Sequence, residues 1–137
     1  ANLLVYAVNR DAHAHAGARR WLEETLMGEE PVGFAWIVLH AFMRLTTHAR
    51  LLPSPLSLED ATGVVDGWLD QPPARIVSPT DRHWPVFKRL LAPLGAGGNL
   101  MMDAHLAALA IEHGASLCSA DNDFARFPEL KWRNPIA

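Results

Sequence analysis

The chain of 137 residues lacks several features that other protein classes need. Its single cysteine, Cys118, cannot form an intrachain disulfide, which favours a reducing cytoplasm. No apolar run approaches the roughly 18 residues of a membrane-spanning helix, and the N-terminus lacks the basic flank of a secretory signal. The net charge of −3 argues against a general nucleic-acid binder with a strongly basic face. We therefore expect a cytoplasmic protein whose contacts with any nucleic acid are local.

What the chain does contain is enough apolar material for a core. Hydrophobic residues make up 50% of it, so one domain can bury a full core without disulfides or a structural metal. We expect a single domain over residues 1–137. The chain opens without methionine on the apolar run 1–8, so we also expect that a few native N-terminal residues are missing.

Strand-like and helix-like patterns alternate along the chain. The short apolar run 3–8 suits a strand buried in a parallel sheet. Apolar residues at helical spacing predict helices, and shorter apolar runs predict strands. The helices are expected at 13–27, 36–47, 57–69, 80–91 and 103–113, the strands at 32–34, 74–77 and 115–119, an edge strand through Trp132, and a glycine-rich loop at 95–99. This order predicts an α/β sandwich around a mainly parallel sheet, in which ligands gather at the carboxyl ends of strands.

Three aspartates lie where such a fold can bring them together. Asp103 falls in the first turn of a predicted helix, where the helix dipole alone would stabilise it. Asp121 and Asp123 follow a predicted strand, where aspartates commonly just bond to turn amides. In a parallel topology all three can converge on one sheet edge, and converging carboxylates are costly without a cation. Hard divalent cations prefer such oxygens, so the group is a candidate metal site.

Other candidate features are weaker. The pair His13 and His15 lacks an acid or cysteine at helical spacing, so it is poor evidence for a metal site. The glycine-rich loop lacks the Lys-Ser/Thr of a phosphate loop and is better interpreted as a cleft rim. Four tryptophans lie on apolar helix stripes, which predicts core or oligomer-interface positions: Trp21, Trp36, Trp68 and Trp84.

Four segments of the chain, residues 2–6, 36–47, 98–110 and 119–124, resemble the PIN-domain ribonucleases of the VapC toxin type. The resemblance runs nearly end to end and is most specific in the last two segments. It implies a PIN-like three-layer α/β/α sandwich and Mg²⁺- or Mn²⁺-dependent endonucleolytic cleavage of structured RNA, of the tRNA or rRNA class. It also implies a VapB-type antitoxin that occludes the site.

Carried over by position, the resemblance makes Asp103 and Asp121 the family's third and fourth acids and the metal ligands. Asp123 is a neighbouring catalytic acid in the same turn. Ser119 matches the small hydroxyl residue that accompanies them, and Asn2 matches the residue that follows the first acid.

Two departures weaken the match. The first acid would stand immediately before Ala1, and the second, usually a glutamate three residues before Arg44, is replaced by Ala41 beside His40. A histidine in an apolar helix is more often a core residue than a substitute ligand. With two of four acids, we expect this chain to hold metal poorly and to cleave RNA weakly.

Two other functions stay open. One is a catalytically degenerate PIN domain that binds RNA or an antitoxin without cutting, and the other is a small α/β enzyme with an unrelated acid-dependent activity. For the toxin, we expect an antitoxin to insert an apolar helix between helices and to place a basic residue near the carboxylates. The apolar helices exceed what one small core needs, which also predicts a homodimer.

Overall fold

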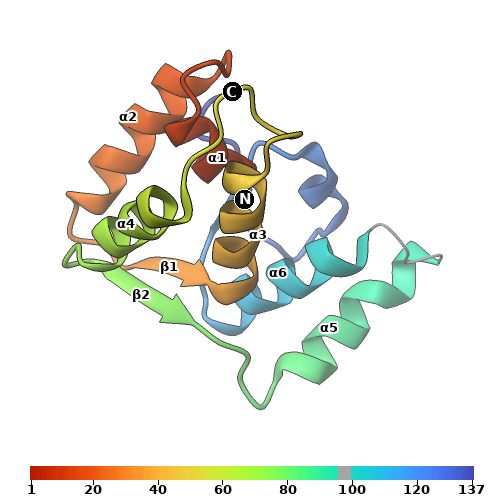
Figure 1. The fold of residues 1–137 in the computed structure, drawn as a ribbon. Helices are drawn as coiled ribbons and strands as arrows, with labels where there is room; N and C mark the ends of the chain where they lie inside the picture. Colours follow the sequence, from red (N-terminus) through yellow and green to blue (C-terminus); the bar gives the residue numbers. More distant parts are fainter. Residues whose placement is uncertain (96–99) are drawn as a thin grey trace. The chain divides into compact units, whose positions relative to one another are not determined.

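The computed structural model describes residues 1–95 and 100–137, so the predicted loop at 95–99 lies outside the described residues except for Gly95. Most helices and strands lie where the sequence predicts them. In chain order they are α1 (Asn2–Val8), α2 (His15–Leu26), β1 (Val32–Ala35), α3 (Trp36–Thr47), α4 (Leu58–Leu69), β2 (Ala74–Val77), α5 (His83–Leu91), the 3-10 turn η1 (Ala92–Leu94), α6 (Met101–Glu112), β3 (Leu117–Cys118), the 3-10 turn η3 (Asn122–Arg126) and β4 (Trp132–Arg133) (Figure 1).

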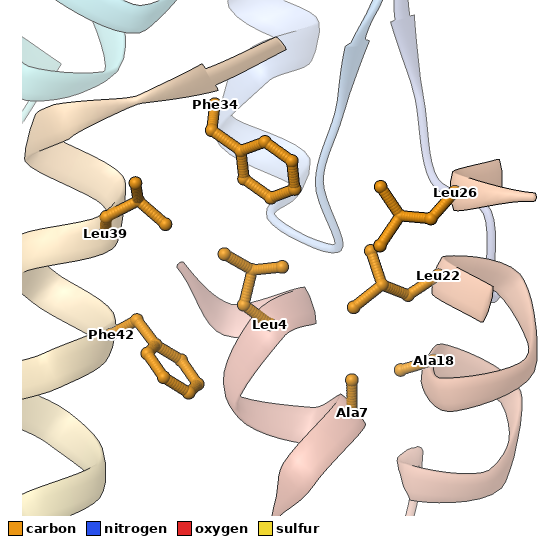
Figure 2. Close-up of a cluster of buried hydrophobic side chains, with 8 residues drawn as sticks. All are labelled: Leu4, Ala7, Ala18, Leu22, Leu26, Phe34, Leu39 and Phe42. Carbon is orange, nitrogen blue, oxygen red and sulfur yellow. The ribbon is translucent and has the colours of Figure 1, made fainter. Parts of the chain in front are cut away.

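The chain forms two compact units, each with its own core. The first unit consists of residues 1–76 with Ile136, and the second of residues 77–135 with Ala137. In the first core, Leu4 of α1 lies between side chains of α2 and side chains of α3 (Figure 2). The α2 side chains are Leu22 and Leu26, and the α3 side chains are Leu39 and Phe42. These contacts hold the three helices together.

The N-terminal segment is a helix, so the predicted strand at 3–8 is wrong. The amide of Val5 donates to Ala1 O at 3.0 Å and that of Asn9 to Val5 O at 2.8 Å, the spacing of an α-helix. Leu3, Leu4 and Ala7 are the buried positions, which share one helical face, whereas a strand would alternate. A short apolar run does not by itself separate a buried strand from a buried helix.

Helix α4 begins as its sequence predicts and brings an aromatic side chain to the first core. The Ser57 hydroxyl caps the helix by accepting the Asp60 amide at 3.0 Å. Trp68 then stacks on Phe34 of β1, with ring centroids 6.2 Å apart, and meets Phe42 edge-on at 4.8 Å.

Of the four tryptophans predicted on apolar helix stripes, two pack against a core and two are exposed. Trp21 and Trp68 pack against the first core as predicted. Trp36 and Trp84 are 51% and 63% exposed, so a core position is wrong for both. The two tryptophan side chains are exposed because each helix buries other apolar positions, Leu39 and Phe42 on α3 and Val86 and Leu90 on α5.

In the second unit, α5 packs against α6 over small side chains. Val86 and Leu90 of α5 share a buried cluster with three alanines of α6 and with two phenylalanines near η3. The alanines leave room for close helix packing. They are Ala104, Ala107 and Ala108, and the phenylalanines are Phe124 and Phe127. Helix α6 ends at Glu112, and two residues later Gly114 has a φ of +62°, which glycine adopts without strain.

The strands form two separate two-stranded sheets within the described residues, β1 with β2 and β3 with β4. The second sheet is parallel, with Leu117 opposite Trp132 and Cys118 opposite Arg133. The predicted edge strand through Trp132 is therefore confirmed, although β3 is shorter than the predicted 115–119. Among the described helices, none is long and apolar enough to cross a membrane.

Candidate metal centre

Three carboxylates converge in the second unit. Asp103 comes from the first turn of α6, and Asp121 and Asp123 come from the turn after β3. Each offers one oxygen, and these oxygens all lie within 4.8 Å of one another. All three residues are half-buried, so the group is open to solvent on one side. The convergence that the sequence predicts is therefore observed.

The turn that carries two of the acids is held by side-chain hydrogen bonds. The Ser119 hydroxyl accepts the amide of Asp121 at 3.0 Å. Asp121 Oδ1 in turn accepts the amide of Asp123 at 2.9 Å and caps η3. The turn interpretation of Asp121 is thus also correct, but one such bond uses only part of a carboxylate's acceptor capacity.

The electrostatics of the cluster favour a cation. Burial raises the pKa of Asp103, and the charges of Asp121 and Asp123 raise it further. Asp123 has a cationic neighbour in Arg126, whose Nε lies 3.8 Å from Asp123 Oδ1, but about half of each side chain is exposed to solvent and such pairs contribute little. A half-buried site with clustered negative charge and hard oxygen donors has the chemistry that a divalent metal requires.

The other predicted participants lie in the first unit. Asn2 is half-buried at the start of α1. Ala41 is half-buried on α3 and has no carboxylate to offer. His40 is exposed, so the core interpretation is wrong, and its ring stacks on Trp36 with centroids 6.2 Å apart. The acidic cluster that the described residues form consists of the three aspartates alone.

Sequence reasoning missed Trp132 as a neighbour of the site. Its indole N–H donates to the carbonyl oxygen of Ser119 at 3.0 Å, and Ser119 is the residue whose hydroxyl holds Asp121. The only signal was the apolar tail that predicted an edge strand. Nothing in a linear sequence shows which carbonyl an indole on that strand will reach.

A buried carboxylate at the other end of α6 was missed as well. Glu112 is 4% exposed and accepts the amide of Thr80 at 2.8 Å and its hydroxyl at 2.7 Å. His83 Nδ1 also bonds to this carboxylate, and His83 Nε2 lies 3.1 Å from His105 Nδ1. Burial raises the pKa of Glu112, but the bonds from Thr80 and His83 outweigh it and leave the pKa below its ordinary value.

The first unit contains a groove of about 1040 Å³ bounded by α2 and α4. Apolar side chains that line it include Leu22, Val64 and Trp68. Gly63 and Gly67 also line it, and a Cβ at either position would meet no atom within 4 Å among the described residues. The groove therefore has open space along one face of α4.

A family model of the PIN domain matches residues 1–130, and the chain belongs to the PIN-domain family. Within that family it is a VapC-type member. It is 49% identical to the ribonuclease VapC37 of Mycobacterium tuberculosis, over 100% of this chain and 95% of that one. It is 43% identical to the ribonuclease VapC43 of the same species, over 98% and 92% of the two chains.

The fold comparison agrees. A crystal structure of VapBC2 from Rickettsia felis, bound to a DNA fragment from its promoter, contains a chain with a TM-score of 0.69 and 21% identity. The match covers 97% of this chain and 93% of that one. The predicted PIN-like α/β fold is thereby confirmed.

Proposed function

We propose that the chain is the ribonuclease toxin of a toxin–antitoxin pair and that its cleavage of RNA depends on a divalent metal. The observation that carries this proposal is the three-carboxylate cluster of Asp103, Asp121 and Asp123. Two relatives that match nearly the whole chain are named as VapC ribonucleases, which supports the reaction class. The substrate class that we propose is structured RNA, such as tRNA or rRNA, in the cytoplasm.

In this proposal Asp103 and Asp121 hold Mg²⁺ or Mn²⁺. A divalent ion held by these residues would supply activation of water as a nucleophile and stabilisation of charge on the phosphate oxygens. Asp123 supplies a third oxygen at the same place, and its amide bond to Asp121 fixes the turn. Ser119 keeps Asp121 in position through its hydroxyl. Asn2 is the second supporting residue of this proposal, beside Ser119.

The test replaces Asp103 by Asn. The variant keeps the shape of the side chain and removes its charge, so we expect cleavage of a tRNA transcript in Mn²⁺ to fall by at least about a hundredfold. Titration calorimetry with Mn²⁺ alone should show lost binding. Asp66→Asn, on the exposed face of α4, is the matched control and should behave as the parent. Normal cleavage by Asp103→Asn would contradict the proposal.

A degenerate PIN domain that only binds is the second candidate, and the alanine at position 41 favours it. This candidate predicts that the parent chain retains RNA in a filter-binding assay and yields no product over hours in Mn²⁺. Cleavage that Asp103→Asn abolishes would exclude it.

We also propose that the groove between α2 and α4 receives an apolar helix of a VapB-type antitoxin. Apolar residues of its mixed lining and its volume suit a helix, and the open face at Gly63 and Gly67 permits close approach of a backbone. In the same complex, a basic side chain of the antitoxin next to the carboxylates would neutralise them without metal.

Filling the groove tests this partner. Gly67→Phe should leave the melting temperature of the free chain unchanged, because Gly67 lines the groove and a Cβ there meets no described atom within 4 Å. It should weaken binding of the antitoxin by at least about tenfold, since the helix is displaced. The probe is the product of a short reading frame upstream of the gene. Asp66→Phe, which lies outside the groove, is the control, and equal affinities of both variants would refute this docking site.

Finally, we propose a homodimer. Large apolar side chains remain exposed in the first unit, among them Met27 (82%), Leu58 (69%) and Trp36 (51%). Light scattering coupled to size exclusion should give twice the mass of 15.1 kDa. A monomer at high concentration would exclude this part of the proposal.

A further inference from the structure

The turn that carries Asp121 and Asp123 follows a very short strand. β3 contains two residues, and in the described part of the chain it pairs with β4 alone. Among the backbone bonds at its two ends, the Leu117 amide donates to Lys131 O at 2.8 Å and the Ser119 amide donates to Arg133 O at 3.1 Å. So short a pair of strands fixes the direction of β3 but constrains little of the turn that follows it.

Trp132 adds a side-chain bond at the point where the ladder ends. It is the register partner of Leu117, yet its indole reaches two residues further along, to the Ser119 carbonyl at 3.0 Å. The ring packs against the buried cluster of the second unit, which fixes its orientation. The packed ring therefore holds its N–H toward the carbonyl oxygen of Ser119.

Ser119 is consequently held at three atoms. Its amide donates to Arg133 O, its carbonyl accepts from Trp132, and its hydroxyl accepts from the Asp121 amide. From there the chain of hydrogen bonds continues through Asp121 Oδ1 to the amide of Asp123. A continuous path thus runs from the indole to two of the three clustered carboxylates.

We propose that Trp132 is a positioning residue of the metal centre. Its indole N–H fixes the peptide that follows Ser119 and thereby the place of Asp121 and Asp123 relative to Asp103. This inference rests on the proposed metal-dependent function, but its effect on the turn exists without metal. If the ring served only to fill the core, the indole N–H would not be needed. Removing that N–H while keeping an aromatic ring therefore tests the proposal.

The test is Trp132→Phe in the full chain, which keeps an aromatic ring and removes the donor. We expect Mn²⁺ affinity in titration calorimetry to fall by about three- to tenfold, the factor that one neutral hydrogen bond supports. We also expect faster hydrogen exchange of the Asp121 and Asp123 amides in the metal-free protein. Trp84→Phe, at an exposed tryptophan of the same unit, should change neither quantity.

A second variant distinguishes the lost hydrogen bond from a loss of Mn²⁺ affinity that is due only to weaker packing of the core. Benzothienylalanine at position 132 keeps the shape and packing of the indole and replaces its N–H by sulfur, so it should reproduce the faster exchange although the core is unchanged. In a double-mutant cycle, Trp132→Phe and Ser119→Ala should be less than additive in Mn²⁺ affinity, because both break the same path.

The outcomes separate the two proposals. Unchanged exchange of both amides in the benzothienylalanine protein, or full additivity with Ser119→Ala, would overturn the role of Trp132. Absence of Mn²⁺ binding by the folded parent would instead overturn the metal-dependent function and with it the metal part of this inference. In that case, faster amide exchange would still support the positioning of the turn.

Discussion

Helix α6 carries two carboxylates, one near each end, that experience opposite surroundings. Glu112 is buried, yet hydrogen bonds from Thr80 and His83 hold its pKa below the ordinary value. Asp103 is less buried, yet burial and the charges of Asp121 and Asp123 raise its pKa. What decides the difference is the set of neighbours rather than the depth of burial.

The contrast separates a structural carboxylate from a functional one. Donors from the chain itself surround the charge of Glu112, which ties the start of α5 to the end of α6. Around Asp103 the nearest charged side chains of the cluster have the same sign. An arrangement of that kind lowers stability and is kept where a ligand supplies the missing charge.

The largest expected effect on stability comes from removing the buried carboxylate of Glu112. Glu112→Leu removes the acceptor and leaves the amide and hydroxyl of Thr80 and the ring of His83 unpaired, so we expect a loss of about 3 kcal/mol in the free energy of unfolding. Urea unfolding measures it. Glu112→Gln retains one acceptor oxygen and should lose less. A loss below that of an average surface substitution would show that the network is not structural.

The pH dependence of stability should follow from the same group. The folded pKa of Glu112 lies below its ordinary value of 4.5, so its contribution is full above 4.5 and is lost as pH falls through the folded pKa. The pKa of His105 is lowered by burial and then by His83, so the unfolded chain takes up that proton first and stability already declines below about 6.5.

Asp103 acts with the opposite sign in this titration. Its folded pKa is raised, so the folded state binds that proton more readily and offsets part of the acid loss. Urea midpoints between about pH 3 and 7 test the balance. We expect the parent to lose stability on acidification and Glu112→Leu to have a flatter profile below 4.5. Parallel profiles of the two proteins would contradict the assignment.

A smaller effect of opposite sign, an increase in stability, is expected at Asp103 near the start of α6. Asp103→Asn removes one of three clustered charges, so in EDTA the free energy of unfolding should rise by about 0.5–1 kcal/mol. Added Mn²⁺ should stabilise the parent and leave the variant unchanged, because stabilisation by a ligand requires binding to the folded state. Destabilisation by Asp103→Asn in EDTA would mean that the carboxylate has a structural role.

The sequence predicted Asp103 and could not predict Glu112, for a physical reason. The metal cluster involves acids close in the sequence, Asp103 to Asp123, at a helix start and a strand end, where the local pattern is informative. The hydrogen bonds of Glu112 reach Thr80 and His83, which lie about thirty positions earlier in the sequence. In the sequence, a glutamate in the last turn of a helix is not distinguishable from an ordinary surface acid. Only packing of α5 on α6 reveals it.

The same limit applies to the fold. Helices α2 to α6 and the strands β1 and β2 were predicted close to their observed bounds, because their apolar spacing or their flanking turns are distinctive. The segment 2–8 was not, since Leu3, Leu4 and Ala7 fit a buried strand or a buried helix equally until a partner is known. The bond from Trp132 to Ser119 depends on strand register, which the short β3 and β4 do not encode locally.

The smallest expected effect separates hydrogen bonding from burial. Glu129 accepts two hydrogen bonds from Arg89, both at 3.0 Å, and this pairing raises the pKa of Arg89, yet both side chains are largely exposed. Water competes with such a pair, so Glu129→Gln should produce no measurable change in the urea midpoint, with or without added salt. If it destabilises the chain as much as Glu112→Gln does, then the number of hydrogen bonds, and not their exclusion from water, explains why Glu112 matters.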